Sequence, residues 1–111
     1  MFAQFFLTSR VNEFAKSLAA DIAKRYPPAI ANNPEQMVSH KRLTTILEEA
    51  FNRAAEFQKE QKLGWFRRAK LVNEFQWELK EFGYDKKFVE MAAEGLLVYV
   101  TRGANPPRET D

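Results

Sequence analysis

Residues 11–26 have the sequence VNEFAKSLAADIAKRY, the clearest helical pattern in the chain. Apolar side chains recur there at intervals of three and four residues: Val11, Phe14, Ala15, Leu18, Ala19, Ile22 and Tyr26. This spacing places them on one face of an α-helix. Thr8 or Ser9 is suited to cap its N-terminus. Pro27 and Pro28 predict its end, because a prolyl ring has no amide hydrogen and disfavours helical geometry in the preceding residue.

A second helix is expected from Asn33, since Asn33-Pro34-Glu35-Gln36 combines an N-cap residue with a first-turn proline. Its main apolar face consists of Leu43, Ile46, Leu47, Ala50, Phe51, Ala54 and Phe57. Val38 projects to the opposite side at about 100° per residue, so we expect a kink or a fresh start near Ser39. Gly64 is the expected end of this helix.

Two more helices complete the pattern. The first is expected over residues 65–82 and is closed by Gly83; its core face consists of Leu71, Val72, Phe75, Leu79 and Phe82. The second is capped by Asp85 and ended by Gly103. The apolar run from Leu96 to Thr101 fits either a helix end buried on every side or a short strand, and a lone strand would need a partner strand.

These elements predict an all-α fold, a small antiparallel helix bundle of about four helices. A length of 111 residues suits one domain. We assign residues 1–103 to that single helical domain, with an apolar N-terminal segment over residues 1–7. Residues 104–111, which contain two prolines and scattered charges, are expected to form a disordered tail.

Composition excludes several classes of chemistry. The chain has no cysteine and one histidine, His40, which we expect at a helix boundary. We therefore expect no catalytic residues, no cofactor site and no metal site, and so no enzyme. The helix-spaced carboxylates Glu48-Glu49, Glu74-Glu78 and Glu90-Glu94 are expected on solvent faces. We also expect no secretory signal, no integral membrane segment and a cytoplasmic location.

Basic and aromatic residues concentrate in the Lys59–Lys70 segment, KEQKLGWFRRAK. Cations around adjacent aromatics suit a phosphate backbone and an unstacked base. The candidate anion-binding residues are Lys59, Lys62, Trp65, Arg67, Arg68 and Lys70. Positive charge at a helix N-terminus opposes the dipole. Three explanations stand: the helix continues through Gly64, an anion or acidic partner binds there, or the charges are solvated and pair with nearby acids.

A second feature lies on the helix expected over residues 65–82. One stripe of this helix faces away from the core and consists of Phe66, Lys70, Asn73 and Trp77. Aromatics on a solvent side usually have cover, and Trp77 is expected to be buried in the functional assembly. The cover could be the segment containing Phe2, Phe5 and Phe6, a second subunit, or another protein.

The chain has 15 aromatic residues, ten of them Phe, more than a bare four-helix core requires. The leading hypothesis is a non-enzymatic interaction module that presents a helical surface, as a homodimer or to a protein partner. Its candidate surface is Phe2, Phe5, Phe6, Phe66, Lys70, Asn73 and Trp77. Nucleic-acid or other polyanion binding through the Lys59–Lys70 segment is the alternative, although a net charge of +2 gives it little support. A small apolar ligand in the bundle core is a third hypothesis.

Overall fold

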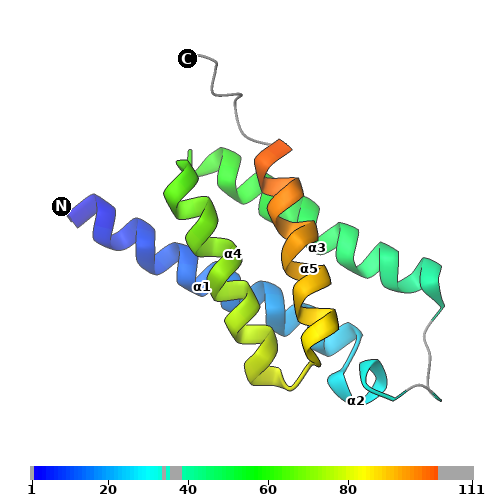
Figure 1. Cartoon of the computed structure of the whole chain (residues 1–111). Coiled ribbons are helices and arrows are strands. Elements are labelled where there is room, and N and C mark those ends of the chain that lie inside the picture. Colours follow the sequence, from blue (N-terminus) through cyan, green and yellow to red (C-terminus); the bar gives the residue numbers. More distant parts are fainter. Residues whose placement is uncertain (1, 34, 36–38, 103–111) are drawn as a thin grey trace.

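The computed structural model describes the backbone of residues 2–33, 35 and 39–102, and the side chains of these residues from Phe6 onward. Within these residues the chain forms five helices and no strand (Figure 1). They are α1 (Phe2–Arg25), α2 (Pro28–Ala31), α3 (His40–Glu60), α4 (Trp65–Phe82) and α5 (Lys86–Arg102). Because α2 is a single turn, the prediction of an all-α bundle of about four helices is confirmed.

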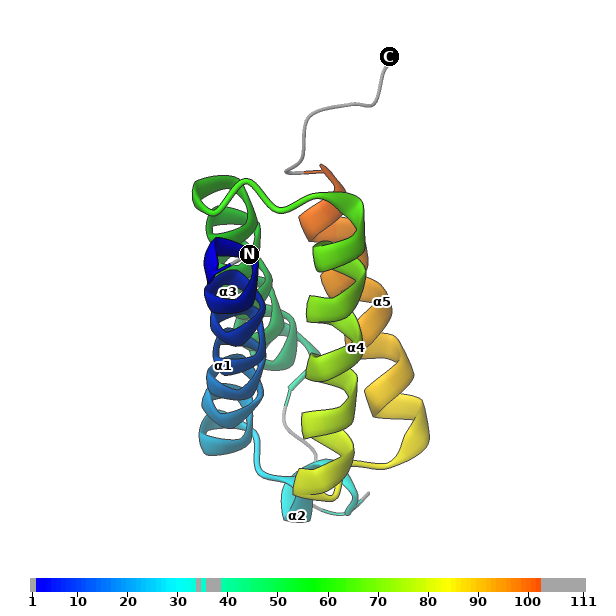
Figure 2. The ribbon, with the colours of Figure 1, turned by 90° about the vertical axis from the view of Figure 1, so that its left-hand side faces the viewer.

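The four long helices form two layers, with α1 and α3 in one layer and α4 and α5 in the other (Figure 2). Helices that follow one another in the chain run in opposite directions, as expected for short connections. Within each layer the two helices contact each other; between the layers α1 contacts α4 and α3 contacts α5. Each long helix therefore buries one face and leaves its opposite face outward.

The core forms where these four faces meet. Its fully buried large side chains come from α1, α4 and α5: Val11, Leu18, Ile22, Leu71, Phe75, Leu79, Val89, Leu96 and Val100. Phe51 of α3 is 5% exposed and completes the core from the fourth side. The apolar periodicities in the sequence thus identify the buried faces correctly.

Several helix ends also follow the sequence. Ser39 is the N-cap of α3, and its Oγ accepts a hydrogen bond of 3.1 Å from Arg42 N, which confirms the fresh start near Ser39. Asp85 Oδ1 accepts a hydrogen bond of 2.9 Å from Phe88 N at the start of α5. Gly83 closes α4 in the left-handed conformation with φ 105°. His40 is exposed and is the first residue of α3, the expected boundary position.

Two predicted helix starts are wrong. Thr8 and Ser9 lie inside α1, which begins at Phe2, so neither caps it. Partial burial of Leu7 against the core favours continuation of the helix over a local cap. No helix begins at Asn33, because Asn33 Oδ1 accepts a hydrogen bond of 2.9 Å from Glu35 N and closes a turn instead. Pro34, Gln36 and Val38 lie outside the described residues, as do Gly103 and the expected tail.

Gly64 does not end α3, and the helix does not continue through it. The last helical residue is Glu60, and Lys62 adopts a positive φ of 54°. Leu63 N then donates to Gln58 O at 2.9 Å and Lys62 N donates to Lys59 O at 3.2 Å, the Schellman pattern. Leu63 is 4% exposed, so its burial fixes this reversal. Gly64 is the N-cap of α4 instead.

The run from Leu96 to Thr101 is helical, so the strand alternative is wrong. It is also not buried on every side. Leu96 and Val100 are fully buried, whereas Leu97 and Val98 are about half exposed, at 47% and 50%. The last turns of α5 therefore have one apolar side inside the bundle and another on its surface.

Candidate interaction surface

The outer face of α4 carries the stripe of Phe66, Lys70, Asn73 and Trp77 identified in the sequence. Leu71, Phe75 and Leu79 on the opposite face are completely buried, so the core holds the helix in the expected orientation. Phe66 is 65% exposed and Trp77 is 56% exposed. Asn73 is exposed and Lys70 is partly buried. The stripe is therefore a real surface feature, and we call it the α4 stripe from here on.

Trp65 adds a third exposed aromatic beside the stripe. It is the first residue of α4 and is 74% exposed. Its ring lies edge-on to that of Phe66, with centroids 6.0 Å apart and planes at 90°. This T-shaped contact orients the two rings relative to each other while leaving most of both surfaces in solvent.

The described residues leave Trp77 56% exposed, so they do not provide the expected cover. The reason is the continuous helix α1, whose N-terminal turns project past α4 instead of folding over it (Figure 1). Phe6, in those turns, is 59% exposed. The side chains of Phe2 and Phe5 lie outside the described residues. Cover by the side chains of Phe2 and Phe5, by a second subunit or by another protein stays a prediction.

The cations of the Lys59–Lys70 segment divide into two groups. Lys59 and Lys62 are exposed at the end of α3 and in the connection that follows. The cations of α4 have contacts within the chain: Arg68 Nη1 donates to Leu63 O at 2.9 Å, and Lys70 Nζ lies 3.7 Å from Glu74 Oε2. Arg67 is partly buried, and its buried Nε has no hydrogen-bond partner. Pairing with neighbouring groups therefore explains part of the positive charge at this helix start.

Charge changes sign along α4. Its first half contains Arg67, Arg68 and Lys70, and its second half contains Glu74, Glu78 and Glu81, interrupted by Lys80. This order is opposite to the one that the helix dipole favours, in which acids lie at the N-terminus and bases at the C-terminus. This order of charges therefore does not stabilise α4 through the helix dipole, and its presence calls for another explanation.

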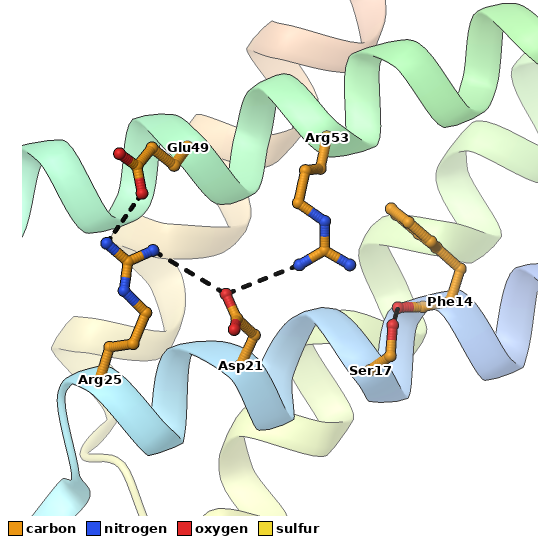
Figure 3. A network of polar contacts seen from close by, with 6 residues as sticks. All are labelled: Phe14, Ser17, Asp21, Arg25, Glu49 and Arg53. Carbon is orange, nitrogen blue, oxygen red and sulfur yellow. Dashed lines mark hydrogen bonds and ion pairs between the residues drawn. The ribbon is translucent and has the colours of Figure 1, made fainter.

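A network of four charged side chains lies between α1 and α3. Arg25 Nη2 lies 2.8 Å from Glu49 Oε1, and Asp21 Oδ2 lies 3.6 Å from Arg53 Nη1 and 4.0 Å from Arg25 Nη1 (Figure 3). These side chains join α1 to α3 on the surface. Next to them Phe14 stacks on Phe57, with centroids 4.1 Å apart. All four charged side chains of the network are paired, on the surface where α1 and α3 meet.

The carboxylate pairs behave as surface groups. Glu48, Glu49, Glu90 and Glu94 are exposed as expected, whereas Glu74 and Glu78 are partly buried. Over the described part of the chain, no three or more His, Cys, Asp or Glu side chains gather closely enough to hold a metal ion. None of the described helices is long and apolar enough to cross a membrane.

Two surface hollows bear on ligand binding. One runs along α4 and is lined by Asn73, Glu74, Gln76, Trp77 and Lys80. The other lies at the start of α3 and is lined by Arg25, Ser39, Lys41, Arg42, Thr45 and Ile46. Both are open to solvent, so neither is the enclosed apolar cavity that binding of a small apolar ligand needs.

Sequence reasoning missed the exposed apolar side chains of α5. Met91 is 43% exposed, and Leu97 and Val98 join it on the surface of that helix. Five consecutive apolar residues, Leu96 to Val100, were the available signal, because a helix with one buried face cannot bury all of them. Phe82, assigned to the core face of α4, is 42% exposed at the end of that helix.

Comparisons of the chain with models of known protein families, with curated proteins and with solved structures found no match in any of the three.

Proposed function

We propose that this chain is a non-enzymatic helical interaction module that binds protein through the outer face of α4. One observation carries the proposal: Trp65, Phe66 and Trp77 are all more than half exposed on one helix. Burying a large apolar side chain is worth about 1.5–3 kcal/mol, so a folded chain that leaves three in water has stabilisation in reserve for a partner. Trp and Phe are also enriched at interfaces, and Trp is enriched among the residues that dominate binding energy.

The neighbours of these aromatics support the same proposal. Arg67, Lys70 and Glu74 border the stripe and are partly buried, so their charged ends lie at the edge of the apolar surface. A polar rim around an apolar centre is the usual anatomy of a protein interface.

The absence of cysteine fits a reducing compartment, and we propose a cytoplasmic location on that ground.

A photoreactive residue tests the proposal. Benzoylphenylalanine at Asn73, in the centre of the stripe, is expected to form a crosslinked product in cells of the source organism. The same probe at Glu48, exposed on α3, is the matched control. The product should disappear when Trp77 is replaced by Ala. A product that forms equally well without Trp77, or no product at all, would contradict the proposal.

Polyanion binding is a second candidate, favoured by one specific observation. Lys62 has a left-handed backbone conformation, which costs a non-glycine residue roughly 1 kcal/mol or more. Glycine would relieve that cost, so a lysine there has a use beyond folding. Exposed Lys59 and Lys62 precede Trp65 in the chain, and Trp65, the most exposed aromatic of the described residues, offers a ring for base stacking. Titration of a labelled single-stranded oligonucleotide at low salt tests this candidate.

A further inference from the structure

We propose that the partner of the α4 stripe is a second copy of this chain, with the two α4 helices packed antiparallel about a two-fold axis. The inference rests on the proposed function, because it names the protein that binds the surface. In this arrangement the axis passes level with Leu71 and Val72, at the middle of the stripe.

The spacing of the stripe supports a two-fold arrangement. Its members follow one another at intervals of four, three and four residues, an order that is the same in both directions. Antiparallel pairing about the centre therefore places Phe66 opposite Trp77 of the second copy, and Trp77 opposite Phe66. Lys70 lies opposite Asn73 of the second copy, and the reverse. Such self-complementarity is the requirement for an interface in which both copies use the same surface.

The charge order of α4 supports the antiparallel direction. Arg67 and Lys70 lie on the same side of the helix as Glu74 and Glu78, one to three turns away, and Lys70 is already 3.7 Å from Glu74. Antiparallel pairing brings the basic half of one helix beside the acidic half of the other, twice. Parallel pairing instead places the two basic halves at one level and the two acidic halves at another, so it brings no opposite charges together. The order that opposes the helix dipole thus favours one direction of association.

The exposed area fits a small dimer interface. A Phe or Trp side chain carries roughly 150–250 Å² of surface. Trp65, Phe66 and Trp77 are each more than half exposed, so together they supply on the order of 300–500 Å². A standard interface needs about 800 Å² from each partner. The charged borders of the stripe must supply the rest, and those are the groups that the antiparallel arrangement pairs.

Sedimentation equilibrium of the full chain tests the association. We expect a monomer–dimer equilibrium, and Phe66→Ala or Trp77→Ala should each raise the dissociation constant at least about 30-fold, since each change removes two aromatic contacts from the dimer. Met91→Ala, at an apolar residue of α5 that is 43% exposed, is the control and should change it less than about threefold. Circular dichroism should show unchanged helix content for all three variants. A wild-type chain that stays monomeric at every accessible concentration overturns the inference.

Charge reversal tests whether the charged borders of the two copies meet. Lys70→Glu leaves three acids and one base on this side of the helix, and Glu74→Lys leaves three bases and one acid. Each variant alone should dimerise more weakly than wild type because it repels its own copy. An equal mixture should form heterodimers, because each acidic border then faces a basic one. Since the Lys70–Glu74 pair within one helix is broken in both variants, its loss cannot explain association on mixing. A mixture no better associated than its components overturns the charge argument.

The absence of native cysteine allows a geometric test. With a rise of 1.5 Å per residue, antiparallel pairing places the two copies of residue 73 about 4–5 Å apart along the helix axis, and the two copies of residue 80 about 25 Å apart. Asn73→Cys should therefore oxidise to a covalent dimer, and Lys80→Cys should not. Crosslinking at Lys80→Cys as efficient as at Asn73→Cys overturns the antiparallel arrangement.

Failure of the inference is distinguishable from failure of the proposed function. A monomeric chain whose Asn73 probe still crosslinks to a different protein, in a way that requires Trp77, loses the second copy as partner but keeps the interaction surface. A monomeric chain whose probe forms no Trp77-dependent product loses both.

Discussion

Gly95 of α5 lies directly against the ring of Phe51 of α3. A Cβ atom built at Gly95 would lie 2.6 Å from Cε2 and 2.9 Å from Cζ of that ring, closer than van der Waals contact allows. The ring cannot easily move aside, because it is 5% exposed and packs against Tyr99 with centroids 5.2 Å apart. The glycine therefore permits the close approach of α3 and α5, and hence the contact between the two layers.

Gly95→Ala is expected to destabilise the protein by about 1–2 kcal/mol, as measured by urea unfolding. Helix propensity alone would predict a gain of about 1 kcal/mol, so the sign of the change identifies the steric contact. Phe51→Leu in the same chain should recover part of the loss, which gives a double variant less destabilised than the sum of the two single ones. A Gly95→Ala variant more stable than wild type would refute this account of the contact.

Tyr84 is expected to make stability sensitive to alkaline pH. Its hydroxyl donates a hydrogen bond to Tyr26 O in the core, and burial, followed by the neighbouring Tyr26, raises the pKa of Tyr84 well above its ordinary value of 10.0. The unfolded chain therefore loses this proton first as pH rises. The free energy of unfolding should fall above about pH 10, by up to about 1.4 kcal/mol per pH unit for this group.

Tyr84→Phe separates this effect from the titration of lysines. The variant should be less stable than wild type near neutral pH, where the hydrogen bond is intact, and the difference should shrink as pH rises from about 9 to 11. Urea unfolding across that range measures it. A constant difference between the two proteins would exclude Tyr84 as the titrating group.

The network around Asp21 is expected to contribute little to stability despite its four charged members. Asp21 and Arg53 are 36% and 48% exposed at their side chains, so water screens the pair. Asp21→Asn should lower the free energy of unfolding by less than about 1 kcal/mol. The effect should decrease further in 1 M salt, where the screening length is about 3 Å. A loss of several kcal/mol, unaffected by salt, would show that the network carries the α1–α3 contact.

Lys62→Gly is expected to separate stability from polyanion binding. Glycine adopts a positive φ without strain, so thermal unfolding should show a gain of about 1 kcal/mol. If the Lys59–Lys70 segment binds a polyanion, the same change should weaken binding to a labelled oligonucleotide and reduce the slope of log affinity against log salt by about 0.7–0.9. The control is Lys24→Ala, which removes one exposed charge from α1. Alanine is used there because glycine is unsuitable within a helix. No binding by the wild-type chain at low salt would remove this candidate function.

The buried faces of the helices could be predicted because burial repeats with the helical period. Leu71, Phe75 and Leu79 are a clear case: their spacing identifies the core side of α4 and, by exclusion, the outward position of Trp77. Helix starts were less predictable. Thr8, Ser9 and Asn33 all have the side-chain chemistry of an N-cap, but tertiary burial of Leu7 and a local turn at Asn33 decide which of them is used.

The position where α3 ends shows another limit. Sequence rules favour glycine at the left-handed residue, yet Lys62 occupies it and Gly64 begins the next helix. The burial of Leu63 determines where α3 ends. That burial depends on packing against the other helices, which the local sequence does not reveal. For the candidate site, the sequence identified the residues of the α4 stripe, but the absence of cover over Trp77 depends on the direction in which α1 projects.

Trp77 fluorescence provides the last prediction. Trp65→Phe leaves Trp77 as the single indole, and at concentrations where the chain is monomeric we expect acrylamide to quench it readily, because the indole is 56% exposed. Deletion of residues 1–7 should lower the melting temperature, since Leu7 packs against the core, without changing the quenching of Trp77. Raising the concentration of the full-length chain should protect Trp77 from quenching, and Phe66→Ala should abolish that protection. If Trp77 is instead shielded in the monomer and becomes accessible only after the deletion, the N-terminal segment covers it. That result would contradict the open surface on which the proposed function depends.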